Sequence, residues 1–180
     1  MYQRSAITFR PLEQDDFRLM YRWLRDPEVA RWYGRAPETL AEVEGKYASR
    51  ISGEEPVQCF IVSYHEKPVA YVQTYRIDHD FEYAEALGVD RDAAGVDLFV
   101  GESAFRYRGF GAVMLRMFVD LIVFGEPRTS CCVIAPSVSN VSAIRAYEKA
   151  GFRHIKTVRV PQESEPEYVM IDWPDEMEME

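Results

Sequence analysis

The chain has 180 residues, a formal net charge of -9, and shares of 47% hydrophobic and 28% charged residues. This length and composition predict one globular domain, residues 1–180, without linkers or repeats. The negative charge argues against nucleic acid and anionic membranes as partners, and it favours a cationic small molecule.

No apolar run is long enough for a membrane span and no signal peptide follows Met1, so we expect a cytoplasmic protein, either a monomer or a homodimer. The acidic tail, residues 175–180, is predicted to be frayed. Cys131 and Cys132 are adjacent, and the third cysteine and three histidines are scattered. We therefore expect packed thiols, no disulfide framework and no metal.

The first part of the chain predicts one strand and then a helical arm. Ala6–Pro11 has the pattern of a strand, and Glu13–Arg25 repeats apolar residues at helical spacing. A short second helix surrounds Val29, and Pro37–Ile51 is a third helical segment with Pro37 in its first turn. The aromatic residues of this arm are Trp32, Tyr33 and Tyr47.

A hairpin and an acidic segment follow the helical arm. Val57–Tyr64 and Pro68–Ile77 are rich in β-branched and aromatic residues, and the three residues between them are typical of a hairpin turn. From Asp78 to Ala94 the periodicity is lost and acidic residues accumulate. A loop of this length within a compact domain favours a functional role.

Around Gly109 a short strand, Val96–Val100, leads through a turn into a helix that runs from Phe110 to Phe124. The first N–H groups of a helix lack partners within it, and the helix dipole is positive there, so this turn can bind an anion. The glycines do not match a dinucleotide fingerprint or a P-loop. They bind a phosphate or, alternatively, they only make a tight turn. The predicted buried face of the helix comprises Phe110, Val113, Met114, Met117, Phe118, Leu121 and Phe124.

The last third of the chain alternates strands and helices again. Ser130–Ala135 predicts a strand parallel to the one before the glycine turn, because a helix connects them. A helix begins after Asn140 and ends at Gly151, and Phe152–Val160 and Glu167–Trp173 are two further strands. We therefore expect a mixed α/β domain with about seven strands and flanking helices.

Two motifs in this order resemble the GNAT superfamily of acyl-CoA-dependent N-acyltransferases. They are Arg106-x-x-Gly109-x-Gly111 and Asn140-x-x-Ala143-Ile144-Arg145-x-Tyr147-Glu148-Lys149-x-Gly151-Phe152. Within the superfamily the chain resembles the aminoglycoside 6'-N-acetyltransferases from about Thr8 to Met170. The segments that carry this narrower resemblance are Leu12-x-x-x-Asp16, Trp23-Leu24, Trp32-Tyr33-Gly34, Tyr71-x-Gln73-x-Tyr75 and Gly95-Val96-Asp97.

The resemblance implies acetyl-CoA as co-substrate and a GNAT-type fold whose parallel strands splay apart. The turn from Arg108 to Ala112 would hold the pyrophosphate through its backbone N–H groups, and pantetheine would lie between the strands Val96–Val100 and Cys131–Ala135. A strand amide near Phe99 would polarise the thioester carbonyl. The predicted cofactor-binding residues are Phe99, Val100, Arg106, Arg108, Gly109, Phe110, Gly111, Ala112, Asn140 and Tyr147.

Two residues match catalytic positions of the family. Asp97 would accept a proton from the substrate ammonium, and Tyr147 would donate one to the departing thiolate. The alternatives are an acid that solvates a strand end and a core tyrosine. Asn140 either touches pantetheine or only caps its helix. The predicted substrate-binding residues are Trp32, Tyr33, Tyr47, Gln73, Asp80, Glu82 and Asp97, although aromatic residues of a helical arm are equally often core.

The sequence therefore predicts acetyl transfer to the 6'-amino group of aminoglycosides by direct attack in a ternary complex. One alternative is an N-acyltransferase for hydroxylated lysine or ornithine side chains, and another is an acyl-CoA sensor without activity. Two departures from the relatives concern drug identity: Ala135 stands where they carry an acid, and Glu85 where they carry a tryptophan.

Overall fold

The computed structural model describes residues 2–77, 84–85, 87–89, 92–160 and 164–174. Asp80, Glu82 and the acidic tail lie outside the described residues. The chain divides into two compact units: Met1–Thr74 with Asp97–Gly111 form the first, and Tyr75–Val96 with Ala112–Glu180 form the second. The prediction of a single domain stays a prediction.

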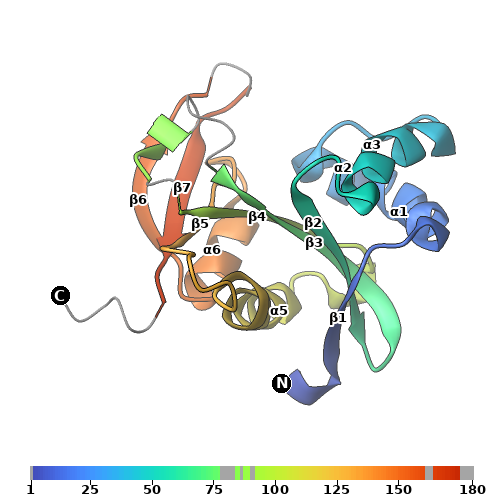
Figure 1. The fold of residues 1–180 in the computed structure, drawn as a ribbon, viewed down its shortest axis with the longest axis horizontal. Helices are drawn as coiled ribbons and strands as arrows, with labels where there is room; N and C mark the ends of the chain where they lie inside the picture. Colours follow the sequence, from blue (N-terminus) through green and yellow to red (C-terminus); the bar gives the residue numbers. More distant parts are fainter. Residues whose placement is uncertain (1, 78–83, 86, 90–91, 161–163, 175–180) are drawn as a thin grey trace. The chain divides into compact units, whose positions relative to one another are not determined.

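The strands form one mixed sheet of seven strands in the order β1-β2-β3-β4-β5-β7-β6 (Figure 1). β1 pairs antiparallel with β2, β4 pairs parallel with β5, and β7 pairs antiparallel with both β5 and β6. The predicted mixed α/β fold is confirmed. The strands are β1 (Ile7–Pro11), β2 (Val57–Tyr64), β3 (Lys67–Arg76), β4 (Ala94–Val100), β5 (Cys132–Ile134), β6 (Arg153–Val158) and β7 (Glu167–Asp172).

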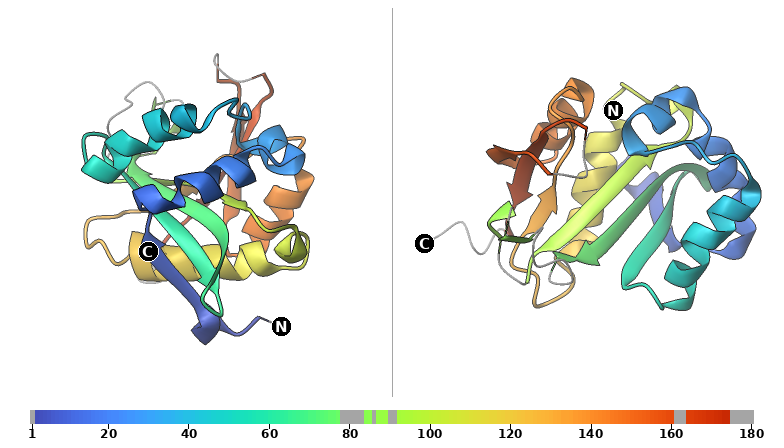
Figure 2. Two further views of the ribbon diagram at one scale, coloured as in Figure 1. Left: turned by 90° about the vertical axis from the view of Figure 1, so that its right-hand side faces the viewer. Right: turned by 90° about the horizontal axis from the view of Figure 1, so that it is seen from above.

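Three α-helices of the described residues follow β1 in the first unit, and two of them begin at a side-chain cap. A 3₁₀ turn at Gln14–Asp16 with a capping box precedes α1 (Phe17–Leu24), and Asp26 caps α2 (Pro27–Tyr33). α1 packs against α2 and α3, and α3 (Leu40–Ser52) packs against β2 (Figure 2). These helices place Phe17, Trp23 and Tyr47 in the core of the first unit.

The prediction that Pro37 lies in the first turn of the third helix was wrong. Thr39 has extended backbone dihedrals and its hydroxyl accepts a hydrogen bond from the N–H of Glu42, so the helix begins at Leu40. A threonine supplies this capping oxygen and a proline does not.

Trp23 fixes the end of α1 to the segment that follows β4. A Cβ on Gly101 would lie 2.2 Å from the indole, so only glycine fits under this ring. The indole N–H donates to Glu102 Oε1 at 2.8 Å. Trp23 is 2% exposed.

The helix after the glycine turn differs from its prediction in the second half. α5 spans Phe110–Phe118, but Val119–Val123 form a π-helical turn in which the N–H of Phe124 donates to the carbonyl of Val119. The wider turn changes the angular spacing of the side chains. Leu121, predicted to lie on the buried face, is 60% exposed.

The second unit also contains α6 (Val141–Lys149). The helix ends before Gly151, whose φ is 107°. Arg116 of α5 donates to the carbonyl of Ala150 at 3.1 Å and to Asp172 Oδ2 at 2.7 Å. Cys131 and Cys132 are buried free thiols, and burial raises the pKa of Cys132 well above its usual range. The prediction that they are packed thiols is confirmed.

Within the described ranges, no helix has the length and apolar character that crossing a membrane requires. The same residues include no cluster of three or more histidine, cysteine, aspartate or glutamate side chains with the arrangement of a metal site.

Candidate active site

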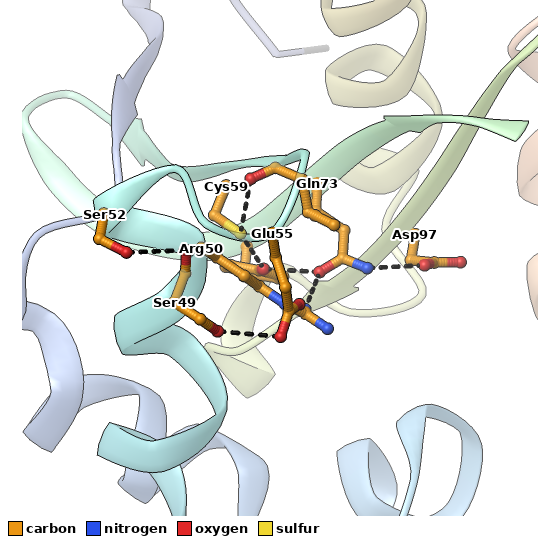
Figure 3. A network of polar contacts seen from close by, with 9 residues as sticks. Ser49, Arg50, Ser52, Glu55, Cys59, Gln73 and Asp97 are labelled. Atoms are coloured by element: carbon orange, nitrogen blue, oxygen red, sulfur yellow. Dashed lines mark hydrogen bonds and ion pairs between the residues drawn. The ribbon is translucent and has the colours of Figure 1, made fainter. Parts of the chain in front are cut away.

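Gln73 and Asp97 lie on neighbouring strands of the first unit and are joined by a hydrogen bond. Gln73 Nε2 donates to Asp97 Oδ2 at 2.8 Å. The other end of the amide, Gln73 Oε1, accepts from Arg50 Nη1 at 2.8 Å and from the Tyr71 hydroxyl at 2.7 Å (Figure 3). Both ends of the Gln73 amide are therefore used inside the protein.

Arg50 reaches Gln73 from the last turn of α3. Its Nε donates to Glu55 Oε2 at 2.9 Å, and the Ser49 hydroxyl donates to Glu55 Oε1 at 2.9 Å. Burial by itself lowers the pKa of Arg50, but the hydrogen bond with Glu55 and the neighbouring acidic groups raise it above its usual value. The same hydrogen bond lowers the pKa of Glu55, so this pair is ionised at neutral pH.

Four aromatic rings pack together next to this polar chain. The ring centroids of Tyr33 and Phe99 are 4.8 Å apart, and Tyr71 stacks on Phe99 at 5.4 Å. Tyr47 contacts Tyr71 edge to face at 5.7 Å. We call Tyr33, Tyr47, Tyr71 and Phe99 the aromatic cluster.

Tyr47 is fully buried, and its hydroxyl has no hydrogen-bond partner among the residues that the structure describes. Burial raises the pKa of Tyr47 to about 12. A buried hydroxyl without a partner is costly, and a ligand atom can relieve this cost. Tyr47 lies in the hydrophobic core of the first unit, where the Tyr33 hydroxyl also acts on its hydroxyl, and its predicted contact with a substrate stays a prediction.

Two cations of α3 lie over the aromatic cluster. The Lys46 ammonium is 5.5 Å from the ring centre of Tyr33 and 5.4 Å from that of Tyr47, and Arg50 lies 5.4 Å from the Tyr47 ring. Burial and the neighbouring Arg50 charge lower the pKa of Lys46. Lys46 therefore loses its proton more readily than an ordinary lysine.

The structure brings four of the predicted substrate residues together: Tyr33, Tyr47, Gln73 and Asp97 lie in one network of rings and hydrogen bonds. Trp32 is half-buried, and the Arg31 guanidinium lies 4.6 Å from its ring centre. Asp80 and Glu82 are outside the described residues.

The glycine turn leaves the right-handed backbone region at two residues, and its predicted binding of the pyrophosphate stays a prediction. Tyr107 and Gly109 have positive φ values of 59° and 83°, and α5 begins immediately afterwards at Phe110. A Cβ on Gly109 would meet no atom within 4 Å, so the space in front of this residue is open. Open space at a helix N-terminus fits the pyrophosphate of acetyl-CoA.

Arg106 holds the entry to this turn. Its three nitrogens donate to the Val100 carbonyl at 2.8 Å, the Gly101 carbonyl at 2.6 Å and Asp26 Oδ1 at 2.8 Å. Because the guanidinium is engaged within the protein, we expect Arg106 to act on the cofactor through the shape of the turn. Arg108 is exposed.

Asn140 and Tyr147, two further predicted site residues, belong to the second unit. The Asn140 side chain accepts a hydrogen bond from the N–H of Ala143 at 3.2 Å, which is the capping role that was left open. Tyr147 lies on α6 and is 9% exposed. Their predicted contacts with the cofactor stay predictions.

Sequence reasoning missed Arg50 and its partner Glu55. One signal was present: Lys46 and Arg50 are like charges four residues apart on a helix, a pair that is unfavourable unless another group compensates it. The compensating groups come from a loop and from β3, and sequence spacing alone does not reveal them.

Residues 13–160 match the family model of the acetyltransferase (GNAT) domain. The chain therefore belongs to the GNAT acetyltransferases, and the predicted superfamily is confirmed.

Similar proteins indicate which members of the GNAT acetyltransferases this chain resembles. The aminoglycoside N(6')-acetyltransferase type 1 of Klebsiella pneumoniae is 30% identical over 159 residues, which are 87% of this chain and 79% of that protein. The crystal structure of AAC(6')-Ib in complex with coenzyme A has a TM-score of 0.81 and 29% identity, over 96% of this chain and 98% of that one. A complex of AAC(6')-Ib with coenzyme A and kanamycin has a TM-score of 0.80 and 28% identity, with the same coverage. The predicted resemblance to aminoglycoside 6'-N-acetyltransferases is confirmed.

Proposed function

We propose that this protein transfers the acetyl group of acetyl-CoA to the 6'-amino group of aminoglycosides, by direct attack in a ternary complex. The observation that carries the proposal is the carboxylate of Asp97, held by the Gln73 amide in the same network as the aromatic cluster. A carboxylate beside aromatic rings suits a substrate that combines ammonium groups with sugar faces. The solved relatives with coenzyme A and kanamycin support this substrate class.

Acetyl-CoA, when bound, supplies the acetyl group as a thioester. Asp97 accepts one proton from the substrate ammonium, which frees the nitrogen lone pair. The Phe99 amide donates a hydrogen bond to the carbonyl oxygen, which gains negative charge as the C–N bond forms. Tyr147 donates a proton to the sulfur as the C–S bond breaks. The nitrogen loses a second proton after the C–N bond has formed, and this proton returns Tyr147 to its neutral form through solvent. Asp97 releases its proton to the solvent, so the products are the N-acetylated amine, the free thiol and one proton.

Lys46 fits this function in spite of its charge. A cationic substrate near the aromatic cluster meets an ammonium group whose pKa is already lowered by burial and by Arg50. Loss of the Lys46 proton on substrate binding reduces the repulsion between the two cations.

The test follows thiol release from acetyl-CoA with aminoglycoside pairs that differ only in an amine or a hydroxyl at the 6' position. Turnover of the amine member alone supports the proposal. Turnover only with hydroxylated diamino acids would move the activity to the alternative N-acyltransferase. Tight binding of acetyl-CoA without turnover of any amine would identify a sensor.

A further inference from the structure

The orientation of the Gln73 amide is decided by Arg50. A glutamine amide has an acceptor oxygen at one end and a donor nitrogen at the other, and a rotation of 180° exchanges them. The guanidinium of Arg50 contains only donors, so the atom 2.8 Å from its Nη1 must be the oxygen. The nitrogen is then the atom that faces Asp97 at 2.8 Å.

Tyr71 reinforces this orientation. Its hydroxyl lies 2.7 Å from Gln73 Oε1 and 3.0 Å from Cys59 Sγ. Oxygen is a stronger acceptor than a thiol sulfur, so the hydroxyl proton points to the amide. The reversed amide would direct its N–H groups at the Arg50 donors and its oxygen at the Asp97 carboxylate. Both contacts would be repulsive.

Arg50 itself is held firmly. Its side chain is 16% exposed, whereas that of Glu55 is 47% exposed. The ion pair thus anchors the guanidinium from the solvent side while its other nitrogen points inward to Gln73. Hydrogen bonds that involve an ionised partner are shorter and stronger than neutral ones.

We propose that Arg50 is a positioning residue for Asp97: through the Gln73 amide it keeps an N–H donor on the carboxylate. A hydrogen bond donated to a carboxylate favours its ionised form, which is the form that accepts a proton from the substrate. The inference rests on the proposed function in one respect, namely that Asp97 is the base.

Other groups also act on Asp97, and one of them offers a control. Among the described residues, Tyr33 from α2 and Lys46 and Tyr47 from α3 interact electrostatically with the Asp97 charge. Lys46 carries the same charge as Arg50 and lies one helical turn away. In the described part of the chain it makes no hydrogen bond to Gln73. Lys46→Met therefore removes a positive charge without releasing the amide.

The decisive measurement is the titration of the Asp97 carboxyl by carbon-13 NMR, with the signal assigned from its loss in Asp97→Asn. We expect Arg50→Met to raise the midpoint by about one pH unit, because the amide loses the charge that orients it. Lys46→Met should raise it by about a third of that or less, through charge alone. Arg50→Lys, which also has only donors, should restore most of the wild-type midpoint.

A double variant distinguishes the effect that Arg50 has on Asp97 through the Gln73 amide from the direct effect of its charge. Gln73→Leu removes the N–H donor, so in the Gln73→Leu background Arg50→Met should add no more than the charge-only shift expected of Lys46→Met. Gln73→Glu keeps a partner for Arg50 but places a negative charge beside Asp97. It should raise the midpoint by more than about one pH unit, and it serves as the second test where Arg50→Met does not fold. Thermal unfolding of every variant monitors folding.

Equal shifts in Arg50→Met and Lys46→Met, or additive shifts in the double variant, would overturn the inference. In variants that turn over, the acid side of the kcat/KM profile should move with the NMR midpoint, and KM for acetyl-CoA should stay within about twofold. The NMR shift does not depend on turnover. If it occurs while no aminoglycoside is acetylated, the proposed function fails and the positioning role stands. If aminoglycosides are acetylated without the shift, the proposed function stands and the positioning role of Arg50 fails.

Discussion

In the first unit, Asp97 is held by a network of side chains, whereas the turn before α5 is shaped by its backbone conformation and by one side chain, Arg106, that donates to backbone carbonyls. Asp97 is fixed through Gln73, Arg50 and Tyr71, each of which contributes a hydrogen bond from a side chain. The turn relies on positive φ values at Tyr107 and Gly109 and on two carbonyls that accept from Arg106. A carboxylate that handles a proton needs neighbours that tune its charge, whereas an anion held by N–H groups needs a fixed backbone.

Within the side-chain network, the substitution of Asp97 has the largest expected effect on catalysis. We expect Asp97→Asn to lower kcat about 10²–10⁴-fold, because the amide cannot accept the substrate proton. Acetyl-CoA affinity should change by less than about twofold, since the change is small and lies outside the turn. Steady-state kinetics and calorimetric titration measure the two quantities. Turnover at more than half of the wild-type rate would exclude Asp97 as the base.

A substitution of Gly109 tests whether the backbone of the turn before α5 binds acetyl-CoA. An alanine at its φ of 83° costs about 1 kcal/mol of stability, and its Cβ enters the open space of the turn. We expect acetyl-CoA to bind about tenfold more weakly to Gly109→Ala.

Gly53 provides the matched control for this experiment. It has a φ of 82° at the C-cap of α3, and a Cβ there would also meet no atom within 4 Å. Gly53→Ala should lose about as much stability, roughly 1 kcal/mol, with unchanged acetyl-CoA affinity. Equal loss of affinity in both variants would show that strain, and not the space at the turn, is responsible.

Substitutions of Arg106 and Arg108 distinguish the contribution of the turn's hydrogen bonds to stability from that of its positive charge. Arg106→Ala removes the Arg106 donors from two carbonyls and from Asp26, which keeps the N–H of Glu28, and we expect a loss of about 2 kcal/mol in the free energy of unfolding. Arg108→Ala removes the same charge from an exposed position and should change stability by less than about 0.5 kcal/mol. Urea denaturation compares them. Equal destabilisation would contradict the clamping role of Arg106.

The last prediction concerns the charge of Asp26. The hydrogen bond from Arg106 holds the pKa of Asp26 below its usual value of 3.8. A lowered folded pKa contributes stability above the unfolded pKa, and this contribution is lost as the pH falls through the folded pKa. Asp26→Asn keeps a residue that caps α2, so it removes mainly the charge.

We expect Asp26→Asn to be less stable than the wild type by about 0.5–1 kcal/mol at pH 7, a modest value because the Asp26 side chain is 33% exposed. Below pH 3.8 the difference should narrow as Asp26 becomes protonated in the wild type. Urea denaturation at pH 7 and pH 3 measures both values. A difference that is independent of pH would assign the effect to capping alone.

Local patterns predicted much of this structure. Strand β2 appears with its expected bounds, and the helix after the glycine turn begins at Phe110 as its first apolar residue predicts. The pattern failed at Leu121, because a regular period of 3.6 residues does not anticipate a π-helical turn. It also failed at Pro37, where the cap at Thr39 determines the start of the helix.

The sequence predicts the turn at Gly109 more completely than it predicts the network around Asp97. The turn at Gly109 is contiguous in sequence, so its glycines and the following helix identify it. Asp97 depends on Gln73 and Arg50, which come from another strand and a helix. Sequence spacing indicates that Arg50 shares a helix face with Tyr47, but the amide that it orients is brought to it only by folding.

The packing of Trp23 on Gly101 also has an optical consequence. An indole that is 2% exposed emits at shorter wavelengths than one in water, and its environment here includes the segment that follows β4. Trp32 in the same unit is half-buried and lies under a guanidinium. With Trp173 of the second unit replaced by phenylalanine, the emission spectrum should therefore contain two components, both from the first unit. The blue one reports whether α1 stays attached to the end of β4.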